Sequence, residues 1–169
     1  MGSASKIKGA SAERQLGKIL SETFGGTFIR SNSSGAIVGG SNIHRKQHLG
    51  IMQLNSLKGD LAPPDHMPKF VIESKHYADF PYHQFLSSSI PLLDNWIEQV
   101  LTIVDENDFW IVAFKTDRKP WAVVFDYSLL SKFKLDRVIR YKNKNGNYFG
   151  ITGLEEFITN KETILKLSA

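Results

Sequence analysis

Residues 70 to 75 read Phe-Val-Ile-Glu-Ser-Lys, an apolar run that leads into an acid and an amine two positions apart. A short apolar run of this kind is typical of a buried strand. Side chains two positions apart on a strand share a face, so Glu73 and Lys75 project together while Ile72 and Ser74 point the other way. The sequence therefore predicts a strand that presents an acid and an amine on one surface.

Asp60, in the stretch Gly-Asp-Leu-Ala at 59–62, is a second acid that a neighbouring strand could bring beside Glu73. Magnesium prefers oxygen ligands, so the two carboxylates could hold the ion while water and a substrate phosphate complete its octahedron. The metal could polarise a phosphoryl oxygen and activate a bound water, which Lys75 could orient. These parts suit phosphodiester hydrolysis, although an acid and a lysine on one strand also form ordinary surface ion pairs.

The composition excludes several other classes of protein. The 169 residues, 41% of them hydrophobic, suffice for one core, and the longest apolar run is too short to span a bilayer. The absence of cysteine excludes disulfides, thiolate zinc sites, iron-sulfur clusters and cysteine nucleophiles. No phosphate-binding P-loop is present, so no nucleotide cofactor is expected. With no export signal or lipid anchor indicated, we expect a cytoplasmic protein without a membrane partner.

Charge is distributed unevenly along the chain, although the net charge is only +4. Lys and Arg outnumber Asp and Glu by 8 to 3 over residues 1–60 and by 8 to 4 over 132–169, whereas acids lead by 10 to 5 over 61–131. Basic flanks can attract a polyphosphate, and an acidic centre can hold the divalent cation that phosphate chemistry often uses. Solvated surface charge is the alternative explanation.

The segments around the 70–75 strand alternate between helical and extended patterns. Apolar residues at helical spacing predict helices, and runs of β-branched and aromatic residues predict strands. We expect helices over 11–24 and 91–104, a helical turn over 127–130 and a short helix over 154–158. Strands are expected over 27–31 and 135–141 and, as an antiparallel pair, over 109–114 and 121–125. With Glu13 on the first helix, this order resembles the PD-(D/E)xK nuclease core. The resemblance implies an α/β, restriction-endonuclease-like fold with a central mixed β-sheet flanked by helices, in a single nuclease domain over 1–169.

Four stretches together resemble the archaeal-type Holliday junction resolvases, which carry that core. The stretches are Lys-Gly-Ala-Ser-Ala-Glu-Arg-Gln-Leu at 8–16, Phe-Ile-Arg-Ser-Asn-Ser-Ser at 28–34, Asp-Leu-Ala at 60–62 and Ile-Glu-Ser-Lys at 72–75. The resemblance covers about residues 6 to 115. It implies a Mg²⁺-dependent endonuclease, with Mn²⁺ as a substitute, that resolves four-way junctions of double-stranded DNA as a homodimer. The short chain and its divergent parts would suit a phage-encoded enzyme that works in the host cytoplasm.

The resemblance assigns roles to the acidic residues and the lysine. Glu13, Asp60 and Glu73 would bind the metal, and Lys75 would assist the attacking water. Asp65 follows two prolines and is a rival for the position that we give to Asp60. We favour Asp60 because apolar residues follow it, as in the family's strand.

Further residues would contact DNA near the scissile phosphate. The resemblance places Arg14 and Arg30 there and Ser34 in the catalytic loop. Gln99, on the expected helix over 91–104, occupies a place where PD-(D/E)xK enzymes often carry a polar helper. A solvent-facing helix residue is its alternative interpretation.

Residues 35–59 depart from the family, in which the serine-bearing loop leads to the aspartate within a few residues. This insertion is basic, and its Arg45, Lys46 and Lys58 could reach phosphates. An inert loop is the alternative. The insertion leaves the role of Ser34 open.

The carboxyl-terminal segment 127–169 has no family counterpart and forms a divergent extension of the core. Its basic residues, with aromatic residues between them, could hold a duplex arm or form an ordinary charged face. They are Lys132, Lys134, Arg137, Arg140, Lys142 and Lys144. Three other functions remain open beside the resolvase: a linear-duplex or repair endonuclease with the same residues, a non-catalytic DNA-binding module, and a structural protein.

Overall fold

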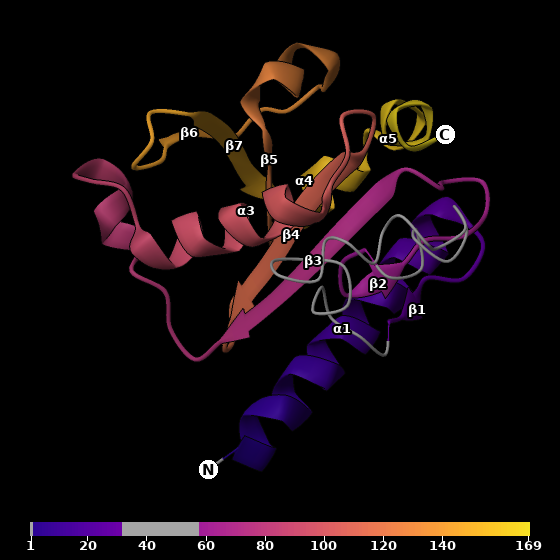
Figure 1. Ribbon diagram of the computed structural model, residues 1–169, viewed down its shortest axis with the longest axis horizontal. Coiled ribbons are helices and arrows are strands. Elements are labelled where there is room, and N and C mark those ends of the chain that lie inside the picture. Colours follow the sequence, from indigo (N-terminus) through magenta and orange to yellow (C-terminus); the bar gives the residue numbers. More distant parts are fainter. Residues whose placement is uncertain (1, 32–57) are drawn as a thin grey trace.

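A mixed β-sheet organises the computed structural model, which describes residues 2–31 and 58–169 (Figure 1). Within these residues seven strands lie in the order β1-β2-β3-β4-β5-β7-β6, and β3 and β4 are parallel while every other neighbouring pair is antiparallel. The strands are β1 (Ile29–Arg30), β2 (Leu61–Ala62), β3 (Phe70–Tyr77), β4 (Phe109–Thr116), β5 (Ala122–Asp126), β6 (Ile139–Lys142) and β7 (Tyr148–Gly153). This arrangement confirms the predicted α/β fold with a central mixed sheet.

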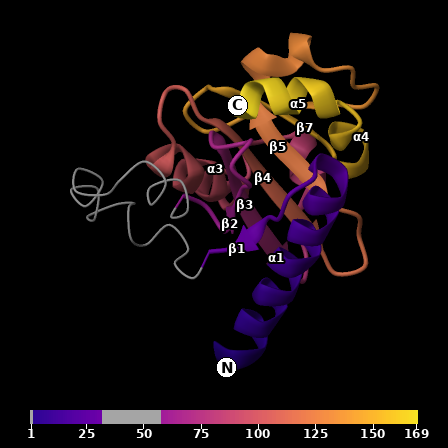
Figure 2. The same ribbon diagram turned by 90° about the vertical axis from the view of Figure 1, so that its right-hand side faces the viewer.

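Helices cover both faces of the sheet (Figure 2). The α-helices are α1 (Gly2–Phe24), α3 (Pro91–Ile103), α4 (Leu154–Ile158) and α5 (Lys161–Ser168), and the 3₁₀ helices are η2 (Tyr82–Leu86) and η3 (Tyr127–Lys132). Apolar residues of α1, α4 and α5 share one core with the sheet, and those of α3 form a second core on the other face. None of the helices in the described ranges is long and apolar enough to cross a membrane.

The strand β3 is buried on both faces, as its apolar sequence predicts. Phe70 and Ile72 belong to the core under α1, and Val71 belongs to the core under α3. Because side chains alternate along a strand, Glu73 and Lys75 follow Val71 onto the α3 side. The expected shared face of the acid and the amine is therefore confirmed.

Most of the predicted elements are present, with shifted ends. The helix expected over 91–104, the short helix at 154–158 and the antiparallel pair β4–β5 are confirmed. The strand expected over 135–141 is partly wrong, because pairing with β7 begins only at Ile139. The helix α1 begins nine residues before the predicted Ser11, and Lys8 in this added part forms an ion pair with Asp117 after β4.

Candidate active site

The carboxylate of Asp60 is fixed by a sharp turn and by the backbone of β3. Gly59, just before it, has a φ of +72°, and a Cβ there would lie 2.4 Å from the carbonyl oxygen of Ile72. Only glycine fits such a position. The amide of Asp60 donates to the Ile72 carbonyl at 2.8 Å, and its own carbonyl accepts from the amide of Ser31 at 2.9 Å. Its Oδ2 accepts from the amide of Ser74 at 2.8 Å, so the carboxylate lies against the middle of β3.

Glu73 and Lys75 form the second part of the site. Glu73 is 6% exposed, and its Oε1 accepts a hydrogen bond from Nζ of Lys75 at 2.7 Å. Its other oxygen, Oε2, is buried and has no hydrogen-bond partner among the described residues. A buried carboxylate oxygen without a donor is costly, so this atom is available to a cation.

Burial and the nearby Glu73 carboxylate raise the pKa of Asp60 to about 7. Burial is the largest cause, and the negative charge of Glu73 is the second; the amide of Ser74 and the ammonium of Lys75 act in the opposite direction. The negative charge of Glu13 also raises the pKa of Asp60, and it is the smallest of these contributions. The site therefore concentrates more negative charge than its own lysine neutralises.

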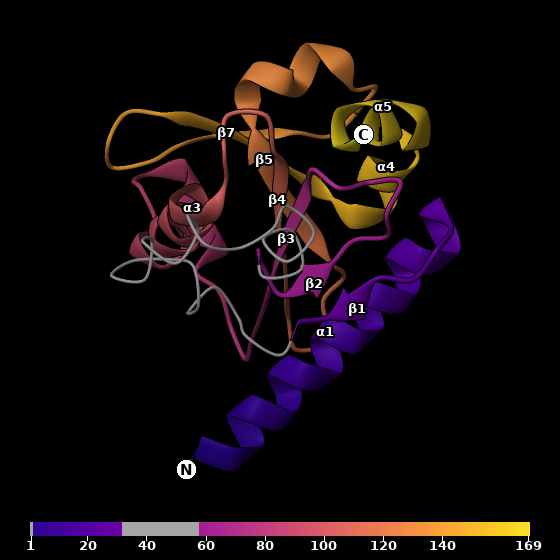
Figure 3. The ribbon, with the colours of Figure 1, turned by 45° about the vertical axis from the view of Figure 1, so that its right-hand side comes forward.

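Glu13 reaches this region from α1, which runs alongside β1 and β2 (Figure 3). Its Oε2 accepts a hydrogen bond from Nε of Arg30 on β1, so the carboxylate is held in an ion pair. Within residues 2–31 and 58–169, no three His, Asp or Glu side chains stand together as a ready metal site. The structure thus brings Asp60 and Glu73 together and keeps Glu13 on Arg30.

These residues fit a divalent cation. Asp60 and Glu73 would hold it, since one offers a carboxylate with a raised pKa and the other an unpartnered buried oxygen. Asp65, the rival of Asp60, is exposed in the turn after β2. The geometry therefore favours Asp60, as the sequence argument does.

A comparison with protein families matches residues 4–166 to the family described as "Phage putative PDDEXK endonuclease". The chain belongs to this family. The match covers nearly the whole chain, including the carboxyl-terminal segment that had no counterpart among the resolvases, and it agrees with the restriction-endonuclease-like fold. No curated protein and no solved structure matches the chain.

Membership of a PDDEXK endonuclease family indicates DNA phosphodiester hydrolysis with a divalent metal. The family name agrees with the acid-x-Lys pattern of Glu73 and Lys75 and with the preceding Asp60. It states neither the form of the DNA nor the oligomeric state.

Lys58 has a different environment from the one expected of a DNA contact. It is 5% exposed, and its Nζ lies 2.7 Å from Oδ2 of Asp105 and 2.6 Å from Oδ2 of Asp108, in the connection between α3 and β4. Burial lowers the pKa of Lys58, but hydrogen bonds and charge from the two aspartates outweigh burial and raise it above the ordinary value. Lys58 is not free to contact DNA because it is packed against the connection between α3 and β4. We therefore withdraw Lys58 as a DNA contact and assign it to positioning the 58–60 turn.

The remaining predicted contacts are exposed or lie outside the described residues. Arg14 is exposed on α1 beside Glu13, and Gln99 is exposed on α3. The exposure of Gln99 agrees with its solvent-facing interpretation. Ser34, Arg45 and Lys46 lie outside the described residues, so their roles stay predictions.

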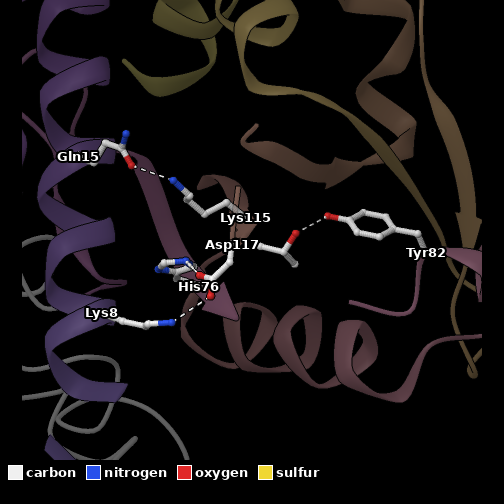
Figure 4. Close-up of polar contacts among 7 residues, drawn as sticks. Lys8, Gln15, His76, Tyr82, Lys115 and Asp117 are labelled. Atoms are coloured by element: carbon white, nitrogen blue, oxygen red, sulfur yellow. Dashed lines mark hydrogen bonds and ion pairs between the residues drawn. The ribbon is translucent and has the colours of Figure 1, made fainter. Parts of the chain in front are cut away.

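A polar cluster at the ends of β3 and β4 was not predicted (Figure 4). Asp117 accepts from Nζ of Lys8 at 3.0 Å and contacts Nε2 of His76 at 2.9 Å. Nearby, Nζ of Lys115 donates to Oε1 of Gln15 at 3.1 Å. The seven-residue spacing of Lys8 and Gln15 on one helix face was the available signal. The cluster fastens α1, which carries Glu13, to the two central strands.

Proposed function

We propose that this protein is a Mg²⁺-dependent endonuclease that resolves four-way DNA junctions as a homodimer. The observation that carries the nuclease part is the pair Asp60 and Glu73, in which a carboxylate of raised pKa lies beside a buried oxygen without a donor. Family membership supports the same chemistry.

Each residue of the site has a separate role in the proposed reaction. Asp60 and Glu73 hold the cation, which when bound stabilises negative charge on the phosphate and activates water. Lys75, whose Nζ is 2.7 Å from Glu73, presents its ammonium where it can orient the attacking water. Arg30 sits beside the site on β1 and can turn from Glu13 to a phosphate oxygen, which would free Glu13 to join the metal ligands.

The junction substrate is supported by the sequence resemblance to archaeal-type resolvases over residues 8–16, 28–34, 60–62 and 72–75. Symmetric cleavage across a four-way junction needs two active sites related by a twofold axis, which is the reason for proposing a homodimer. The phage family supports action on DNA in the cytoplasm of a host cell.

The experiment that tests this function compares a labelled four-way junction with a linear duplex of the same arm sequence, in Mg²⁺ and then in EDTA. Glu73→Gln is the matched control, because the amide keeps the size of the side chain and removes its charge. We expect paired nicks at symmetric positions of the junction, none in the duplex, and none with Glu73→Gln or EDTA.

Equal cutting of junction and duplex would support the assignment as a nuclease but contradict specificity for junctions. The protein would then be a linear-duplex or repair endonuclease. Tight junction binding without cutting in Mg²⁺ or Mn²⁺ would reject the enzyme in favour of a DNA-binding module.

A further inference from the structure

Four side chains form what we call the tyrosine–arginine surface: Tyr127 at the start of η3, Arg140 and Lys142 on β6, and Tyr148 on β7. The guanidinium carbon of Arg140 lies 3.9 Å from the ring centre of Tyr148 and 5.4 Å from that of Tyr127. The ammonium of Lys142 lies 5.7 Å from the ring centre of Tyr148. The aromatic rings thus hold Arg140 in place by cation–π contact.

The cations of this surface are available to an anion. Arg140 and Lys142 are exposed, and neither forms an ion pair within the described part of the chain. Lys144, two residues further on, is by contrast paired with Glu98 at 2.8 Å. A guanidinium already ordered on aromatic faces loses little conformational entropy when it binds a phosphate.

A cavity of about 350 Å³ adjoins the surface at the free edge of β6. Ser87, Ser88 and Ser89 line it together with Arg140 and Lys142, and no Asp or Glu is among the described residues of its wall. Serine hydroxyls and backbone amides are common donors to phosphate oxygens in DNA complexes. The cavity therefore extends the anion-binding character of the surface.

The position of this surface separates it from the catalytic residues. Figure 1 shows β6 and β7 at the side of the sheet away from β1 and β2. β6 is four places from β3 in the strand order, which at about 4.8 Å a strand is roughly 19 Å. Tyr141 between the two cations is buried in the core under α3, so Arg140 and Lys142 emerge on the face opposite to that of Glu73. A DNA backbone bound here would therefore lie across the sheet from Glu73 and on its opposite face.

We propose that the tyrosine–arginine surface binds the sugar–phosphate backbone of a second arm of a branched DNA substrate. The assignment to a second arm rests on the proposed junction specificity. Backbone contact of this kind carries no base information, which agrees with recognition of DNA by its shape.

The test measures equilibrium binding of a labelled four-way junction and of a single-arm duplex over a series of salt concentrations. The variant is Arg140→Gln with Lys142→Gln, in a Glu73→Gln background that prevents cutting. The matched control in the same background is Lys161→Gln with Lys166→Gln, which removes two exposed positive charges from α5. Melting temperatures check that each protein is folded, and Lys142→Gln alone replaces the double variant if that one is unstable.

We expect the Arg140 and Lys142 variant to bind the junction about 10-fold more weakly, with the salt slope reduced by about 2, while its duplex affinity stays within about twofold of the parent. The control should bind both DNAs as the parent does. Junction affinity and salt slope equal to those of the parent would overturn the proposal. An equal loss on duplex and junction would also overturn it, since the surface would then lie on the cleaved arm. Failure of junction specificity itself would appear separately, as equal binding of both DNAs by the parent.

Discussion

At the scale of single residues, Asp60 is a buried carboxylate whose charged form is disfavoured by its surroundings. Its carboxylate is 6% exposed and shares a buried region with Glu73, and the two charges repel each other. Such an arrangement costs stability in the metal-free protein and becomes favourable when a cation is bound. The same carboxylates that we assign to catalysis should therefore govern how stability depends on pH and on metal.

We predict that Asp60→Asn makes the metal-free protein more stable above pH 7. Because the folded pKa of Asp60 is raised to about 7, the folded state keeps a proton that the unfolded chain releases near pH 4, so the parent loses stability as the pH rises through this window. The asparagine keeps an oxygen to accept from the Ser74 amide and carries no charge. Because one pKa unit corresponds to about 1.4 kcal/mol, melting in EDTA should show little gain at pH 4 and a gain of roughly 4 kcal/mol at pH 8, with about half of it already present at pH 5.5. A variant less stable than the parent at pH 8 would contradict this explanation.

We also predict that Mg²⁺ or Mn²⁺ raises the melting temperature of the parent at pH 8 but not that of Asp60→Asn or Glu73→Gln. A ligand that binds only the folded state stabilises it by about 2.7 kcal/mol at 100 times its dissociation constant. Asp65→Asn is the control that separates the two candidate ligands, and it should respond as the parent does. A normal metal response in Asp60→Asn together with its loss in Asp65→Asn would assign the metal to Asp65.

At the scale of the elements, the turn over residues 58–60 determines where the side chain of Asp60 lies. Lys58 is held by Asp105 and Asp108, and Gly59 approaches the backbone of β3 too closely for any side chain. The connection between α3 and β4 thus supports the turn from one side and β3 supports it from the other.

For Lys58→Met we expect a loss of about 3 kcal/mol of folding stability and a weaker metal response. The reason is that Asp108, whose side chain is 8% exposed, would be left as an unpaired buried charge. Asp105→Asn, at a side chain that is 62% exposed, should cost less than about 1 kcal/mol. Denaturant unfolding measures both effects, and equal losses in the two variants would show that burial of the pair is not what matters.

Elements with a strong local pattern were predictable, and those that depend on distant partners were not. α3 and the pair β4–β5 have regular apolar spacing, so their limits could be set within a few residues. β2 has only two residues, Leu61–Ala62, and exists because it pairs with β3. β7 contains Gly150 and a short apolar run, and its place between β5 and β6 is determined by tertiary pairing.

In the site, too, the features set by neighbouring residues were predictable, and those set by residues far away in the sequence were not. The shared face of Glu73 and Lys75 followed from strand alternation alone, and the structure confirms it. Lys58 looked like one more exposed lysine of a basic loop, because its partners Asp105 and Asp108 lie 47 and 50 residues away. No local pattern could reveal that pairing.

At the scale of the whole molecule, the proposed catalytic site and the proposed DNA-binding surface lie in different parts of the sheet. The acidic site lies on β3 near one side of the sheet, and the tyrosine–arginine surface lies on β6 and β7 at the other (Figure 1). A substrate with several arms could contact both at once, and two subunits related by a twofold axis would present two acidic sites to it. We therefore expect the Asp60 and Glu73 site to cut both strands of a branched DNA.

Incubation with a supercoiled plasmid that extrudes a cruciform measures whether the protein cuts both strands. In Mg²⁺ the parent should convert the plasmid to linear DNA by paired cuts at the cruciform, Glu73→Gln should leave it supercoiled, and mixed dimers of the two should yield nicked circles. A parent that leaves the plasmid supercoiled in both Mg²⁺ and Mn²⁺, or that linearises a plasmid without the cruciform equally fast, would contradict cleavage of branched DNA at this site.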